Sequence, residues 1–193
     1  MPIKAANVTE LHAAKDWIVV DLGFSNRRKS CGMLIENNAS LLTFAEVKDE
    51  LAKICEKRHS RPLYLMLEAP LSVAFDVQGN PVGRRFEKRD SITRYWYSGL
   101  GCSVLTSATY LLRHLHDMKI KRDIRLIEGF ASFKREGTDH IKDARGLRDV
   151  VLKGKGGKIH GRDELADGDT DLIMSAFAVA GMDFGVPPVV ELI

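Results

Sequence analysis

The sequence predicts an α/β fold in which helices cover both faces of a mixed central β-sheet. Apolar, β-branched runs at 17–25, 63–70 and 123–130 predict strands, because strands covered on both faces are apolar throughout. Apolar residues at helical spacing follow the first two of these runs, at 44–54 and 105–115. Strands that alternate with helices are typical of a layered α/β domain. With 193 residues and no internal repeat or linker, residues 1–193 form one domain.

The first half of the chain predicts a meander and a helix. The strand at 17–25 is followed by a hairpin partner at 29–37 and a short third strand at 40–44. Thr43 and Glu46 have the spacing of a capping box, so a helix is expected to begin there. Residues 1–16 are taken as an N-terminal flank of this unit.

The second half predicts further strands and helices around an excursion. The apolar run at 63–70 predicts a strand that ends at Glu68 and is stopped by Pro70, and residues 71–103 are expected to form a hairpin or loop insertion. A helix at 104–118, the strand at 123–130 and an amphipathic helix at 139–152 follow. The uncharged run after Asp171 predicts a last, buried helix.

Composition and terminal sequence restrict the class of protein. No apolar run reaches the ~18 residues that a membrane span needs, and residues 1–17 lack the continuous apolar stretch of a secretory signal. Three widely spaced cysteines form neither a disulfide framework nor a metal knuckle. We therefore expect a cytoplasmic protein without a membrane partner.

Basic residues gather in three segments although the net charge is only +3. The segments are 27–29, 84–94 and 153–162, and the second continues into Tyr95, Trp96 and Tyr97. Cations beside aromatic rings suit a polyanion, because they meet phosphates while the rings stack on bases. Any one segment can equally be a solvated loop. The expected nucleic-acid contacts are Arg84, Arg85, Lys88, Arg89, Lys155 and Lys158.

Three acidic residues stand in otherwise apolar surroundings. Asp21 lies in the first strand, Glu68 ends a second strand, and Asp171 opens the last expected helix. An ionised carboxylate is costly to bury unless it is paired or binds a metal. If the three converge, Mg²⁺ or Mn²⁺ would remove their mutual repulsion, since hard cations prefer oxygen ligands.

Structural roles remain open for each acid. Asp21 can accept hydrogen bonds at a strand end, and Glu68 can be a paired structural acid. Asp171 can cap a helix, although capping suits Asp167 and Asp169 better. Glu128 has the position of an ordinary strand-end residue.

These motifs, in this order, resemble the ribonuclease H-like superfamily with its Holliday-junction resolvases and integrases. More narrowly, the chain is similar to a family of predicted ribonuclease H-like nucleases of unknown function. The resemblance spans nearly the whole chain and rests on VVDLG (19–23), EAPL (68–71), RRFEKRD (84–90), IEGFASF (127–133), ARGLRDVV (144–151) and DGDTDLIMSAFAVA (167–180).

The resemblance implies that Asp21, Glu68 and Asp171 are the metal ligands and catalytic carboxylates. It adds Asp167 as a further ligand and Glu128 as an accessory acid. Two departures stand out: many relatives carry Asp where this chain has Glu68, and Gly168 replaces an additional acid.

The expected function is therefore a metal-dependent nuclease that cleaves DNA or RNA with Mg²⁺ or Mn²⁺ and an activated water. The alternative is a nucleic-acid-binding domain of the same fold without catalysis. A sugar-kinase or actin-like phosphotransferase ranks last, because it needs a duplicated domain and a second phosphate-binding glycine motif. A resolvase-like homodimer is compatible with the sequence, which identifies no interface.

Overall fold

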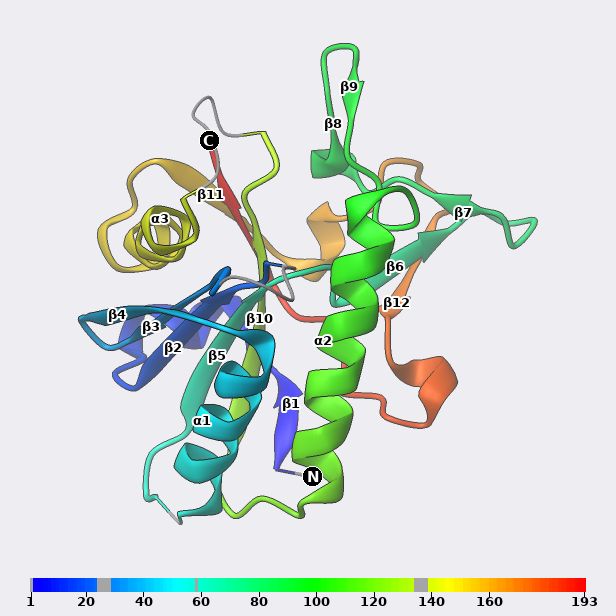
Figure 1. Cartoon of the computed structure of the whole chain (residues 1–193). Coiled ribbons are helices and arrows are strands. Elements are labelled where there is room, and N and C mark those ends of the chain that lie inside the picture. Colours follow the sequence, from blue (N-terminus) through cyan, green and yellow to red (C-terminus); the bar gives the residue numbers. More distant parts are fainter. Residues whose placement is uncertain (1, 24–28, 58, 134–138) are drawn as a thin grey trace.

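The computed structural model describes residues 2–23, 29–57, 59–133 and 139–193. An eight-stranded mixed β-sheet forms its centre (Figure 1). Its strands lie in the order β11 (Gly157–His160), β13 (Val189–Leu192), β10 (Ile124–Phe130), β5 (Leu63–Glu68), β2 (Trp17–Asp21), β3 (Cys31–Ile35) and β4 (Asn38–Leu42), while β1 (Ile3–Ala5) pairs with the first half of β10.

The sheet combines an antiparallel meander with parallel strands. β2, β3 and β4 are antiparallel neighbours, whereas β5 runs parallel to β2 and β10 runs parallel to β5. These strands match the predicted strand segments, because each apolar run is long enough to cross the core once. The prediction of an α/β fold with a mixed sheet is thus confirmed.

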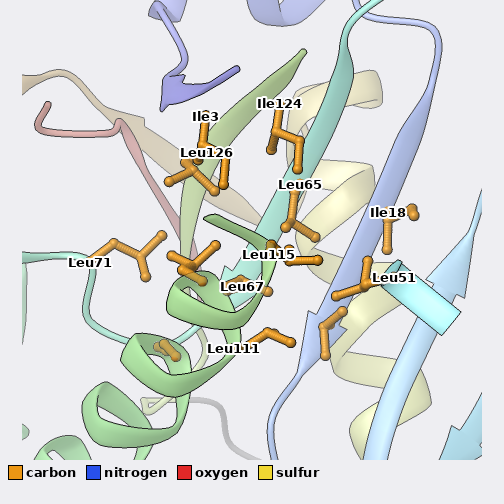
Figure 2. Close-up of a cluster of buried hydrophobic side chains, with 14 of the residues drawn as sticks. Ile3, Ile18, Leu51, Leu65, Leu67, Leu71, Leu111, Leu115, Ile124 and Leu126 are labelled. Atoms are coloured by element: carbon orange, nitrogen blue, oxygen red, sulfur yellow. The ribbon is translucent and has the colours of Figure 1, made fainter. Parts of the chain in front are cut away.

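Helices cover both faces of the sheet. α1 (Phe44–Glu56) and α2 (Leu100–Asp117) pack on one face, where they form a core with inward side chains such as Leu65, Leu67 and Leu126 (Figure 2). α3 (His140–Lys153) packs on the opposite face, against the alternate residues of the same strands. Because strand side chains alternate between faces, each strand contributes to both cores.

The predicted helix after Asp171 is wrong. This segment forms strand β12 (Leu172–Ser175), a short 3-10 turn η4 (Ala178–Ala180) and a loop that leads into β13. β12 pairs with β6 (Ser72–Phe75), which also pairs with β7 (Pro81–Val82), in a separate three-stranded sheet. A short uncharged run suits a buried strand as well as a helix, and pairing with a distant strand decides the outcome.

Residues 71–103, where a hairpin or loop insertion was expected, contain two hairpins and the start of α2. β6 and β7 form the first, and β8 (Lys88–Arg89) and β9 (Ile92–Thr93) form the second, which stands away from the sheets (Figure 1). The 3-10 turn η2 (Arg85–Glu87) joins the two hairpins, and a further 3-10 turn, η3 (Arg162–Glu164), follows β11.

The N-terminal residues join the domain: β1 extends the sheet and the 3-10 turn η1 (Val8–Ala13) buries Leu11. Within the described ranges, no helix combines the length and the apolar character that a membrane crossing requires.

Candidate functional site

Asp21 and Glu68 lie side by side at the carboxyl ends of two neighbouring parallel strands. Asp21 on β2 is the register partner of Glu68 on β5. Asp21 alternates with Ile18 and Val20 of the α1–α2 core, so its side chain belongs to the α3 face of the sheet, and Glu68 occupies the matching position of its strand. Because adjacent strands are ~4.8 Å apart, the two carboxylates lie on one face as neighbours.

His140, the first residue of α3, holds the buried carboxylate of Asp21. Its Nδ1 lies 2.9 Å from Asp21 Oδ1, and Asp21 is only 4% exposed. Asp139 caps α3 by accepting hydrogen bonds from the backbone N–H groups of Ile141 and Lys142. Sequence reasoning missed His140, because only the packing of α3 on the sheet brings it to a strand 119 residues earlier in the chain.

Two glycines create the space that His140 occupies. Gly32 on β3 is the register partner of Asp21 on β2. A Cβ at Gly32 would lie 2.2 Å from the carbonyl oxygen of His140. A Cβ at Gly23 would lie 2.9 Å from His140 Nε2. The start of α3 therefore approaches the sheet backbone more closely than any other residue type at position 32 would allow.

Glu68 is oriented by the strand on its other side. Its Oε1 accepts a hydrogen bond of 3.2 Å from the backbone N–H of Ala131, just beyond β10. Its register partner on β10 is Gly129, which carries no side chain. A Cβ at Gly129 would lie 2.9 Å from Leu147 Cδ1, so the glycine lets α3 pack closely on β10 beside Glu68.

Asp21, Glu68 and His140 line a cavity of about 740 Å³, which we call the carboxylate cavity. The facing wall comes from residues 93–101, which run from the end of β9 to the first turn of α2, so the cavity lies between the main sheet and this segment. The residues of that segment that line it include Thr93, Arg94, Tyr95, Ser98, Gly99 and Leu100.

The structure does not bring Asp171 or Asp167 to this cavity. Asp171 Oδ2 accepts a hydrogen bond from the backbone N–H of Gly168, and the chain then enters β12, which pairs with β6. Asp167 is exposed on the same loop. The expected cluster of three carboxylates depended on a helix that aimed Asp171 at the sheet, and the segment is a strand of a different sheet instead.

Glu128 points to the opposite face from Glu68 and forms a buried ion pair with Arg84. The carboxylate accepts hydrogen bonds from Arg84 Nη1 and from the backbone N–H of Leu71, both at 2.8 Å. Glu87 binds the same guanidinium at 2.8 Å. The predicted nucleic-acid contact through Arg84 is therefore wrong, because its side chain is buried between two acids and does not reach the surface.

Burial and neighbouring charges shift the pKa values of Glu128 and Arg84 in opposite directions. Burial raises the pKa of Glu128 above its usual value, and the charge of Arg84 only partly offsets this. Burial alone would lower the pKa of Arg84, but the carboxylates of Glu128 and Glu87 raise it instead. Arg84 consequently stays charged, and these acids serve the packing of residues 71–87 on β10.

The remaining basic residues have different surroundings. Arg89 forms an ion pair of 2.6 Å with Glu191 and stacks over Phe133, so its charge is largely neutralised. Four predicted contacts are exposed but do not line the carboxylate cavity: Arg85, Lys88, Lys155 and Lys158. Arg94, in contrast, is exposed and lines the cavity.

The donor set fits a hard cation that shares its coordination sphere with a substrate. Among the described residues, no three His, Cys, Asp or Glu side chains form a group that could hold a metal by themselves. Mg²⁺ commonly uses only one or two carboxylates, together with waters and substrate phosphates. Asp21 and Glu68 match that smaller set, whereas a closed site such as structural zinc needs four protein ligands.

Comparisons with models of known protein families, with curated proteins and with solved structures each found no match.

Proposed function

We propose that the chain is a metal-dependent nuclease that hydrolyses phosphodiester bonds, with Mg²⁺ or Mn²⁺ held by Asp21 and Glu68. The observation that carries this proposal is the in-register placement of the two carboxylates at the side of a cavity. Two neighbouring carboxylates repel each other, and a divalent cation offsets that repulsion while leaving positions for phosphate oxygens. When bound, the cation supplies positive charge at the phosphate and lowers the pKa of a water.

The protein residues around the cavity would orient the reacting groups. His140 binds Oδ1 of Asp21 and so fixes the orientation of the carboxylate. The second oxygen, Oδ2, therefore also keeps one direction. The N–H of Ala131 restrains Glu68 in the same way. Arg94 places a positive charge on the facing wall, where it can bind a backbone phosphate.

The strand arrangement supports the resemblance to ribonuclease H-like proteins. An antiparallel meander of β2, β3 and β4 is followed by the parallel strands β5 and β10, with helices on both faces. This arrangement is compatible with that fold, and Asp21 stands on its first long strand as the resemblance implies.

A nucleic-acid-binding domain without catalysis is the second candidate. The observation that favours it is the small donor set: apart from Glu87, which binds Arg84, the carboxylates of the described residues that line the cavity are Asp21 and Glu68, without Asp171 as a third. Exposed cations such as Lys88 and Arg94 would bind phosphates in either case.

Cleavage assays on single-stranded, duplex and branched DNA and RNA, with Mg²⁺, Mn²⁺ or EDTA, separate these functions. We expect metal-dependent cleavage that Asp21→Asn and Glu68→Gln abolish. Asp171→Asn is the matched control and should cleave normally, because Asp171 lies outside the cavity. Calorimetric titration with Mn²⁺ gives a readout independent of activity.

Each outcome decides one point. Mn²⁺ binding that disappears in Asp21→Asn but persists in Asp171→Asn supports the two-carboxylate site. Nucleic-acid binding without cleavage in any metal overturns the nuclease proposal and favours the binding domain. Loss of cleavage in Asp171→Asn, with the fold retained, would show that Asp171 joins the site after all.

A further inference from the structure

The wall that faces the two carboxylates is aromatic and fixed in place. Tyr95 lines the cavity, and its ring stacks on Tyr97 with a centroid separation of 5.2 Å and an interplanar angle of 22°. Trp96 anchors the same segment, because its Nε1 donates a hydrogen bond of 3.0 Å to the carbonyl of Val82. The wall is thus tied to β7 and is held without a ligand.

Gly83 provides the space for the Tyr95 ring. A Cβ at Gly83 would lie 2.1 Å from Cε1 of Tyr95, so only glycine allows the ring to lie against the backbone there. Tyr97 is 37% exposed and continues the stack toward solvent. A flat, partly exposed pair of rings is a suitable surface for stacking a nucleic-acid base.

Arg94 adds charge beside these rings. Its Nη1 donates to the carbonyl oxygen of Thr93, and in the part of the chain that the structure describes it forms no ion pair. The opposite side of the cavity carries Asp21 and Glu68. The cavity therefore presents a ring and a cation on one wall and the proposed metal ligands on the other.

The burial of Asp21 within the cavity favours a single-stranded over a double-stranded nucleic acid. Asp21 is buried and lines the cavity, which has room for a few nucleotides and not for the width of a double helix. Bases in a duplex are paired and stacked, so they cannot stack on Tyr95 unless they are flipped out. A single strand can insert a base and a phosphate without that cost.

We infer that this cavity binds single-stranded nucleic acid, with a base against the Tyr95–Tyr97 ring pair and a backbone phosphate on Arg94. The inference rests on the proposed function for its choice of substrate, and it names the class of nucleic acid that the site accepts. Stacking is possible for every base, so binding depends little on sequence.

The test is fluorescence anisotropy of labelled oligonucleotides in EDTA, where binding is measured without cleavage. Single-stranded DNA, single-stranded RNA and duplexes of the same sequence are compared. We expect single strands to bind at least about tenfold more tightly than duplexes. Tyr95→Leu should weaken single-strand binding by about tenfold, and Tyr95→Phe should retain it, because the ring provides the stacking surface.

Arg94→Gln tests the phosphate contact separately. Removing one phosphate contact lowers the slope of log affinity against log salt by about 0.7 for a single strand. Tyr110→Leu and Arg113→Gln are the matched controls, since both residues are exposed on α2 outside the cavity lining. Circular dichroism of all variants establishes that they are folded.

The two proposals fail in different ways. Equal binding of duplexes and single strands, or unchanged binding by folded Tyr95→Leu, overturns the single-strand inference even when Mg²⁺-dependent cleavage is observed. Single-strand binding that depends on Tyr95 but never leads to cleavage supports the inference and overturns the nuclease. Tighter binding of single strands than of duplexes supports the inference for either DNA or RNA, and the tighter of the two single strands shows whether the site prefers deoxyribose or ribose.

Discussion

Arg84 and Glu128 form an ion pair of 2.8 Å with both side chains buried. The pair joins the segment that carries β6 and β7 to the central strand β10, 44 residues further along the chain. Ser72 and the backbone of Leu71 bind the same carboxylate. The pair therefore fixes residues 71–87 against the sheet and, through them, the wall of the carboxylate cavity.

Replacing Arg84 should destabilise the protein far more than replacing its neighbour. Arg84→Met leaves Glu128 and Glu87 buried without their cation, which costs about 3–5 kcal/mol. Arg85→Met changes an exposed residue and should alter stability by less than about 0.5 kcal/mol. Urea denaturation followed by circular dichroism measures both. Similar midpoints for the two variants would contradict a structural role for Arg84.

His140→Ala should weaken metal binding without removing a proposed ligand. The variant loses the 2.9 Å contact that holds Asp21, and loss of such a supporting partner lowers metal affinity by about 10- to 100-fold. Mn²⁺ titration calorimetry measures the affinity, and His12→Ala, at an exposed position of η1, is the control. An unchanged Mn²⁺ affinity in folded His140→Ala would show that Asp21 needs no such support.

Gly32→Ala should displace the start of α3. The added Cβ would lie 2.2 Å from the carbonyl oxygen of His140. The backbone of α3 packs on the sheet there, so moving it away from the new methyl group strains the interface. We expect a loss of about 1–3 kcal/mol in unfolding free energy together with weaker Mn²⁺ binding. Gly161→Ala is the control, because the nearest atoms to its Cβ are 3.7 Å away. Equal thermal stability of the two variants would refute the close approach.

Glu191 should stabilise the fold more at neutral than at acidic pH. Burial acts to raise its pKa, but hydrogen bonds and charge from His160 and Arg89 outweigh burial and lower the pKa below its usual value. A carboxyl whose pKa is lowered by folding contributes stability above its unfolded pKa and loses it as the pH falls through the folded pKa. Glu191→Gln should therefore cost about 1–2 kcal/mol at pH 7 and less at pH 3.

Urea denaturation of wild type and Glu191→Gln at the two pH values measures this difference. Glu50→Gln serves as the control, because Glu50 lies on the surface of α1 with a highly exposed lysine as its partner. A difference between wild type and Glu191→Gln that grows on acidification would reverse the expected sign and refute the assignment.

The local sequence pattern was sufficient to predict the three α-helices and the central strands β2, β3, β4, β5 and β10. The capping box of Thr43 and Glu46 is present at the start of α1, and the apolar runs form β2, β5 and β10. These features depend on neighbouring residues, so periodicity and capping reveal them. The same patterns predicted Asp21 within the first strand and Glu68 at the end of the second, and β2 in fact ends at Asp21.

Only the tertiary structure decided which acids meet and which cations stay free. Asp21 and Glu68 are neighbours because β2 and β5 pair in parallel register, and Asp171 is excluded because its segment pairs with β6. Arg84 is buried because Glu128 lies opposite it, although its sequence neighbourhood matches that of exposed Arg85. The sequence by itself determined the three α-helices and the central strands with their apolar faces. Pairings between distant residues decided the site, because contact energies between such residues leave no local pattern in the chain.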